Sequence, residues 1–236
     1  LLPHFIVDPT RQQLSQISQI LRTCSHSEQK APVHGAISIT YHLLQHFSFD
    51  AVILYYQKLL KKMSVLWSSS TLQIKAVRRF VITAIGIFTL HAPQVLQLFA
   101  QMGVDMSDLC TFARQWLFTL GTDLFPKEFS LRVMDIILFD PCGIASLSGV
   151  FTGLLYHCYE LSLYDCEHNN ISPSFSQLHL FPKHKNFSTD TVLVAGYNLF
   201  RTNFPDIEAK FLNITLNLCL YNSDCSLCYP NPVFIA

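Results

Sequence analysis

Charged residues and long apolar runs are both scarce in this sequence. Only 14% of the 236 residues are Asp, Glu, Lys or Arg, and 16 basic residues balance 16 acidic ones. A protein that neutralises nucleic-acid phosphates needs an excess of positive charge, so no nucleic-acid partner is expected. A hydrophobic content of 50% excludes a disordered chain. The longest apolar run, residues 80–90, falls short of the roughly 18–20 residues that cross a bilayer. It therefore predicts a buried helix and no transmembrane segment.

Glycine is also scarce, and no secretory signal is visible. The chain has 8 glycines and no glycine-rich loop that could cradle a phosphate, so we expect neither a nucleotide site of its own nor a cofactor. The first residues lack the basic start and apolar stretch of a secretory signal. The 8 cysteines lie mostly inside or beside apolar stretches, which favours free thiols in a reducing compartment. We therefore expect a cytoplasmic protein.

Cys225 and Cys228 form the one CxxC pair of the chain. Thiolates at this spacing can hold a tetrahedral zinc ion, with Cys219, Cys166 and His168 available as further ligands. A second CxxC pair is missing, so no metal site is expected.

Apolar residues recur at helical spacing through most of the first two-thirds of the chain. Residues 52–63, 77–88 and 109–120 each carry one broad apolar stripe, and Asp50 is placed to cap the first of them. A further helix is expected from Pro126 to the Asp-Pro-Cys-Gly breaker at 140–143, and another from about 143 to 163. The pattern predicts an all-α, multi-helix protein.

The composition changes after Tyr164. Asn, Ser, Pro and His gather between 166 and about 188, which is typical of a long surface loop. Shorter elements are expected at 191–200 and 206–221, the second with an alternation that also fits a strand. We expect one domain over 1–236, with an N-terminal and central part over 1–140 and a C-terminal part over 141–236.

The stretch 92–135 carries the most specific pattern. A helix after Pro93 leads to Gln115-Trp116-Leu117, then to Leu124-Phe125-Pro126, and then to Glu128, Arg132 and Asp135. The order and spacing resemble the second half of the TBC domain, the helical fold of Rab GTPase-activating proteins. Asp50 and Ala51, opening an aromatic-rich helix, are similar to an earlier helix of that family. Met134 departs, because the family prefers Trp there.

The resemblance implies an arginine supplied in trans to a GTPase. The family's IxxDxxR motif matches residues 5–11, with Phe5 in place of Ile. Arg11 is then the candidate arginine finger, and Asp8 the carboxylate that braces it by a charge-assisted hydrogen bond. The alternative is that Asp8 and Arg11 form a turn capping a helix that starts near Gln12.

The second family motif, Tyr-x-Gln-Gly, is only partly present. Pro32-Val33-His34-Gly35 occupies its place, so His34 stands where the family has the water-orienting glutamine. An imidazole has a donor and an acceptor on opposite sides of the ring, which differs from the geometry of a carboxamide.

Two functions follow from this resemblance. The first is a module that binds a GTP-bound Rab-type small GTPase and stimulates its hydrolysis through Arg11, with Asp8 and His34 completing the site. The second is a catalytically inactive relative that binds a GTPase or acts as a scaffold. Both imply vesicle trafficking at endomembranes, with peripheral membrane association through partners. Lys58, Lys61 and Lys62 are interpreted as a solvated helix end, with docking to a membrane or a GTPase as the alternative.

Overall fold

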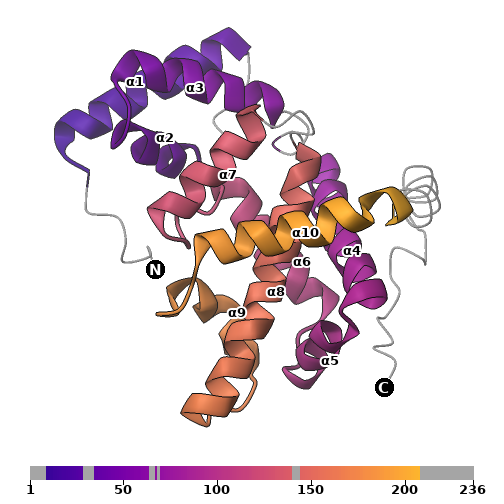
Figure 1. Ribbon diagram of the computed structural model, residues 1–236. Coiled ribbons are helices and arrows are strands. Elements are labelled where there is room, and N and C mark those ends of the chain that lie inside the picture. Colours follow the sequence, from indigo (N-terminus) through magenta and orange to yellow (C-terminus); the bar gives the residue numbers. More distant parts are fainter. Residues whose placement is uncertain (1–8, 29–34, 64–66, 68–69, 140–143, 208–236) are drawn as a thin grey trace. The chain divides into compact units, whose positions relative to one another are not determined.

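In the computed structural model, the described residues form α-helices joined by turns (Figure 1). These residues are 9–28, 35–63, 67, 70–139 and 144–207. No strand occurs within these ranges. The predicted all-α class is confirmed, because each apolar stripe at helical spacing lies in a helix.

The chain divides into two compact units. Unit 1 comprises Leu1–Ala76 and Arg114–Ile144, and unit 2 comprises Val77–Ala113 and Ala145–Ala236. Unit 1 is therefore built from two segments that are separated in the sequence by the whole first segment of unit 2. The boundaries fall inside α4 (Ser70–His91) and α6 (Met106–Thr119) and at the start of α8 (Ile144–Asn169).

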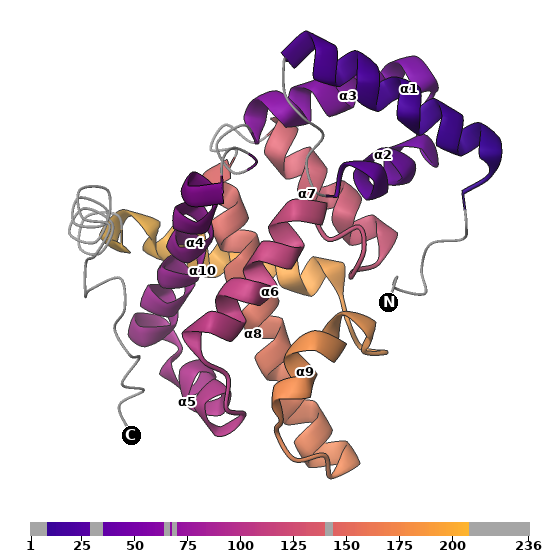
Figure 2. The same cartoon turned by 180° about the vertical axis from the view of Figure 1, so that it is seen from behind.

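Unit 1 contains α1 (Arg11–Glu28), α2 (Ala36–Leu44), α3 (Phe49–Lys62), the start of α4, the end of α6, and α7 (Lys127–Phe139). Helix α1 packs against α2 and α3, and α3 also packs against α2 and α7 (Figures 1 and 2). Helix α3 is preceded by Ser48 as its N-cap, so Asp50 lies in the first turn and is not the cap we expected. Helix α7 starts at Lys127, one residue after Pro126.

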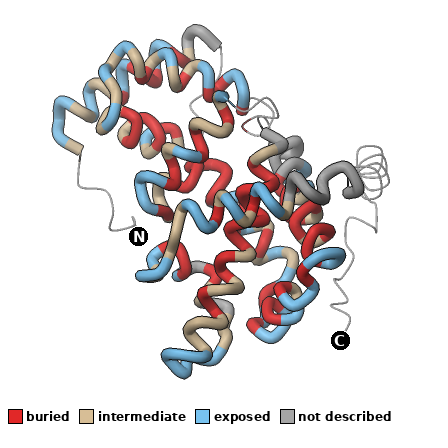
Figure 3. The backbone as a smooth tube through the Cα atoms, viewed as in Figure 1, coloured by how far each residue is buried: buried red, intermediate tan, exposed pale blue. Residues whose placement is uncertain are grey.

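Apolar residues from the second part of the stretch that resembles the TBC domain, 114–135, lie in the core of unit 1, whereas Glu128 and Arg132 are exposed. The side chains of Trp116, Phe129 and Met134 are at most 1% exposed, and α2 and α7 are buried along their inner sides (Figure 3). Trp67 Nε1 donates a hydrogen bond to the Leu117 carbonyl oxygen at 3.2 Å, which ties the chain after α3 to α6. Trp116 is thus a core residue of unit 1.

Unit 2 contains the rest of α4, α5 (Pro93–Gln101), the start of α6, α8, α9 (Phe175–Leu180), the 3₁₀ helix η1 (Phe181–Lys183) and α10 (Thr189–Ile207). The apolar run 80–90 lies in α4 with its helical stripe buried, as predicted. Among the described helices none is by itself long and apolar enough to cross a bilayer; α4 and α5 pass that test only together, and they are bent by 115°.

Helices α8 and α10 touch through their backbones. A Cβ atom on Gly153 would lie 2.1 Å from the Val192 carbonyl oxygen, and one on Gly196 would lie 2.3 Å from the Gly149 carbonyl oxygen. Such distances leave no room for any side chain, so these glycines set the separation of the two helices.

The long loop expected over 166–188 is instead largely structured. Helix α8 continues to Asn169, and α9 and η1 follow. Ser174 and Gln177 form a reciprocal capping box that starts α9, while Leu178, Phe181 and Pro182 are buried. A local cap and a few buried apolar side chains therefore outweigh the polar composition. The element expected at 206–221 lies outside the described residues from 208 onward.

Candidate functional site

Arg11 is the first residue of α1 and its side chain is exposed. The helix start is held by a reciprocal cap: the Thr10 amide donates to Gln13 Oε1 at 2.9 Å, and the Gln13 amide donates to Thr10 Oγ1 at 3.2 Å. Such a capping box satisfies two amides at the helix start, because each side chain pairs with the other residue's backbone. Arg11 therefore projects from a defined backbone position into solvent.

Helix α1 is anchored by one apolar face. Ile17, Ile20 and Cys24 are buried, and α1 packs against α2 and α3. Burying an isoleucine side chain contributes roughly 1.5–3 kcal/mol each. This packing fixes the axis of the helix whose first residue is Arg11.

Of the three predicted site residues, only Arg11 is described. Asp8 and His34 lie outside the described residues, as does the rest of the 5–8 segment. The helix expected to start near Gln12 begins at Arg11, and the Thr10 side chain caps it; whether Asp8 also caps this helix stays a prediction.

Gly35, the last residue of the second motif, occupies a position that only glycine fits. Its φ of 86° lies in the left-handed region, and it is the N-cap of α2. A Cβ atom there would lie 2.5 Å from the Phe118 carbonyl oxygen and 3.1 Å from Thr119 Cα. The start of α2 thus rests directly on the backbone at the end of α6.

A set of polar side chains joins α2 to the α6–α7 connection. We call Ser38, His42 and Gln45 the α2 polar stripe, since their spacing puts them on one helix face. Ser38 Oγ donates to Asp123 Oδ1 and lies 2.9 Å from Thr122 Oγ1. The other two residues contact Lys127: His42 Nε2 donates to its carbonyl oxygen at 3.2 Å, and Gln45 Oε1 accepts from its Nζ.

Sequence reasoning missed this stripe. A usable signal was present, because Ser38, His42 and Gln45 recur at i, i+4 and i+7 along α2 and its C-cap. The stripe fixes the orientation of α2 relative to the α6–α7 connection, and it does so from the helix that follows His34 and Gly35.

His42 makes the stability of unit 1 pH-dependent. Burial, with the nearby His46, lowers the pKa of His42 from 6.5 to about 4, and the hydrogen bond to the Lys127 carbonyl offsets this only in part. Between these values the unfolded chain binds the proton and the folded chain does not. The free energy of unfolding is therefore expected to fall as the pH drops from 6.5 to 4, by less than about 1.4 kcal/mol per pH unit, the full slope for an unscreened group.

The measurement is thermal unfolding of wild type and His42→Gln between pH 4 and 7. His42→Gln should flatten the dependence over this range, whereas His91→Gln, at an exposed position, should leave it unchanged. An identical slope in wild type and His42→Gln would contradict the assignment.

Two histidines of unit 2, His157 and His184, have structural roles. The Ser188 amide donates to His157 Nε2 at 3.2 Å, and the Asn186 amide donates to His184 Nδ1 at 3.1 Å. The second ring nitrogen of each contacts a carboxylate, Glu160 for His157 and Asp165 for His184. Burial of Asp165 opposes its ionisation, but the hydrogen bonds from His184 and Asn169 outweigh it and lower its pKa. These rings have no nitrogen left for a metal or a substrate.

No group of His, Cys, Asp or Glu side chains that could hold a metal ion occurs in the part of the chain that the structure describes. Cys225, Cys228 and Cys219 lie outside that part, so the CxxC pair stays a sequence-level observation. The four described cysteines form no disulfide, and burial raises the pKa of Cys158 to about 12, which makes that thiol a poor nucleophile.

Comparison of the chain with protein-family models, curated proteins and solved structures finds no match.

Proposed function

We propose that this chain is a TBC-type module that binds a GTP-bound Rab-type small GTPase and accelerates GTP hydrolysis through Arg11. The observation that carries the proposal is the position of Arg11: exposed, at the first residue of a helix, with that helix start fixed by the Thr10–Gln13 cap. An arginine finger must reach out of its own protein from a fixed backbone position, and Arg11 meets both requirements.

The proposed role of Arg11 is electrostatic stabilisation of the transition state. Its guanidinium stays charged at any physiological pH and presents several donors in one plane. Placed against the transferred phosphoryl group, it offsets the negative charge that develops in the transition state. Asp8, three residues earlier in the sequence, is the proposed brace that limits the rotamers of Arg11.

The second element of the proposal is the start of α2. Gly35 needs its left-handed conformation to pass the α6 backbone, which is a physical reason for the glycine of the second motif. His34, directly before it, is the proposed partner of the attacking water, either alone or with a glutamine of the GTPase. A module with this partner acts in the cytoplasm, at endomembranes.

Single-turnover GTP hydrolysis on a panel of Rab proteins tests the proposal. We expect at least one GTPase to hydrolyse GTP faster with the chain present. Binding without acceleration would favour the inactive relative, a reading supported by Pro32 and His34 in place of Tyr and Gln. If the chain neither binds any of the GTPases nor accelerates hydrolysis, the active and the inactive hypotheses are both contradicted.

His34→Gln is expected to raise the stimulated rate on the order of 10-fold, because a carboxamide presents its donor and acceptor on one edge. The measurement is the same single-turnover assay at saturating chain. His46→Gln, at an exposed position after α2, serves as the control and should not change the rate. A slower rate with His34→Gln would show that the imidazole itself is required.

A further inference from the structure

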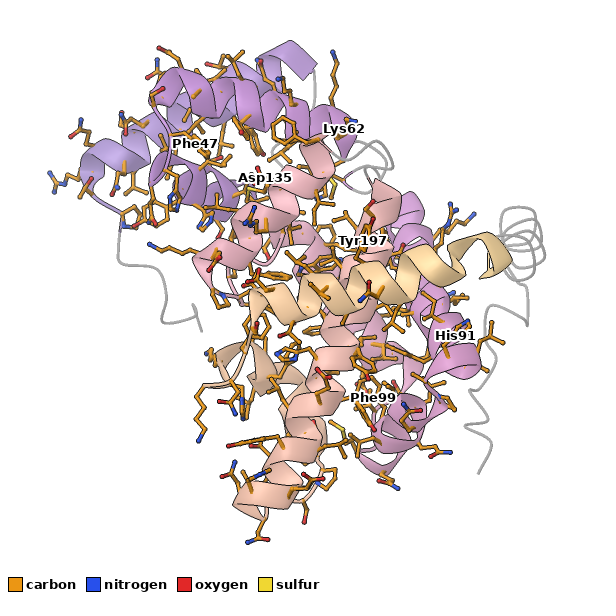
Figure 4. All side chains as sticks on the ribbon, in the orientation of Figure 1. Phe47, Lys62, His91, Phe99, Asp135 and Tyr197 are labelled. Carbon is orange, nitrogen blue, oxygen red and sulfur yellow. The ribbon has the colours of Figure 1, made fainter. Side chains whose placement is uncertain are left out.

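The solvent-facing side of α3 combines lysines with an exposed leucine. Leu54, Lys58, Lys61 and Lys62 are all exposed, and Leu54 retains 60% of its surface. At 3.6 residues per turn these four positions fall within an arc of about 100°. We call them the lysine face; Lys62 lies at the C-terminal end of α3 (Figure 4).

The lysines of this face have no acidic partner among the described residues. Asp50 lies on the same side of α3, but about 12 Å of helix separates it from Lys58, more than a Debye length of about 8 Å. Lys61 and Lys62 fall in the last turn, where they complement the helix dipole. That role accounts for neither Lys58 nor the exposed Leu54.

A lysine beside an exposed aliphatic residue also occurs at the start of α4. Ile74, 49% exposed, stands next to the exposed Lys75 in the part of α4 that belongs to unit 1. Positive charge is also concentrated in this unit: unit 1 holds 10 Lys and Arg against 7 Asp and Glu, and unit 2 holds 6 against 9. The zero net charge of the whole chain therefore hides an excess of three positive charges in unit 1.

We propose that the lysine face binds the surface of an anionic lipid bilayer. The ammonium groups would lie among the phosphates while the lysine stems and Leu54 contact the outer part of the acyl region. Each lysine held at an anionic surface strengthens binding about fivefold at physiological ionic strength. This proposal does not depend on the proposed GTPase or on Arg11.

The composition of the face favours lipid over an acidic protein. Protein interfaces are depleted in lysine and draw most of their affinity from Trp, Tyr and Arg anchors. The lysine face has none of these anchors, only lysines and one aliphatic side chain. Flexible ammonium groups beside a single exposed aliphatic residue fit a fluid layer of headgroups, which needs no fixed geometry.

Co-sedimentation of the full chain with vesicles tests the proposal. We expect binding to vesicles of 70% phosphatidylcholine and 30% phosphatidylserine, and little binding to pure phosphatidylcholine. The triple variant Lys58→Gln, Lys61→Gln, Lys62→Gln should lower the partition coefficient on the order of 100-fold. Leu54→Gln, which leaves the charge unchanged, should also lower it.

The matched control removes the same charge from exposed positions of unit 2, through Arg79→Gln, Lys183→Gln and Lys185→Gln. It should keep wild-type vesicle binding, and circular dichroism should show all variants folded. Equal binding to both vesicle types, absence of binding, or an unchanged triple variant would each overturn the proposal. So would a triple variant that binds vesicles normally but loses stimulation of a GTPase in solution, because the face would then dock a protein.

Discussion

Arg11→Ala is expected to lower the stimulated rate of GTP hydrolysis by at least about 10³-fold, at the low end of what an arginine finger contributes. The side chain is exposed and its backbone is held by the Thr10–Gln13 cap, which the substitution leaves in place. The fold should therefore persist, and binding to the GTPase should change far less than the rate. The measurement is single-turnover hydrolysis with saturating chain, beside a separate binding titration.

Arg22→Ala is the matched control for this experiment. Arg22 is an exposed arginine on the same helix, three turns from Arg11, so its removal costs the same charge without touching the helix start. It should leave the rate at the wild-type level. Arg11→Lys should recover only a small part of the rate, because an ammonium is a point charge without the planar fork. An Arg11→Ala variant as fast as wild type would rule out the arginine-finger role.

Gly35→Ala is expected to destabilise unit 1 by at least about 2–3 kcal/mol. An L-residue in the left-handed region costs roughly 1–2 kcal/mol, and the new Cβ would in addition lie 2.5 Å from the Phe118 carbonyl oxygen. The obstacle is backbone, which cannot rotate away as a side-chain end can, so α2 or α6 must shift. Denaturant unfolding of the full chain measures the change, and the GTPase assay then reports whether the start of α2 has moved.

Gly103→Ala separates the two contributions. Gly103 also has a positive φ, 71°, but nothing lies within 4 Å of the Cβ position. Its substitution should therefore cost only the conformational part, roughly 1–2 kcal/mol. If Gly35→Ala costs no more than Gly103→Ala, the contact with the α6 backbone does not constrain α2.

Most of the helical architecture could be predicted from the sequence, because its signal is local. The apolar stripe of residues 52–63 appears in α3 with Val52, Tyr56 and Leu59 buried, and the run 80–90 is a buried part of α4. Periodicity of this kind requires only that each helix bury one face, so it can be recognised without knowing what the helix packs against.

The features of the fold that could not be predicted depend on tertiary contacts, which leave no local pattern in the sequence. The burial of Leu178 and Phe181 gives structure to a stretch whose composition is that of a loop. The left-handed conformation of Gly35 is set by its contact with Phe118, 83 positions later in the chain. The division into two units, with residues 114–144 in unit 1, likewise follows from contacts across the sequence.

The candidate site was predictable only where a motif marked it. The resemblance to the family's IxxDxxR motif indicates Arg11, and the structure adds the cap at the start of its helix. The α2 polar stripe has a helical spacing of its own, but its partners could not be predicted, because Asp123 and Lys127 lie 85 positions later in the chain, before and at the start of α7. Hydrogen bonds between distant segments leave no spacing rule that identifies the partner.

The two-segment construction of unit 1 has a consequence for synthesis on the ribosome. Helices α1, α2 and α3 leave the exit tunnel well before α7, which α3 packs against and which follows the first segment of unit 2. At about 5–20 residues per second, several seconds pass between residue 76 and residue 139. Throughout that interval the apolar face of α3 that packs against α7 in the folded unit lacks its partner helix. Unit 1 thus cannot complete its core in the order in which it is made, and its first three helices are the stretch for which a chaperone would matter most.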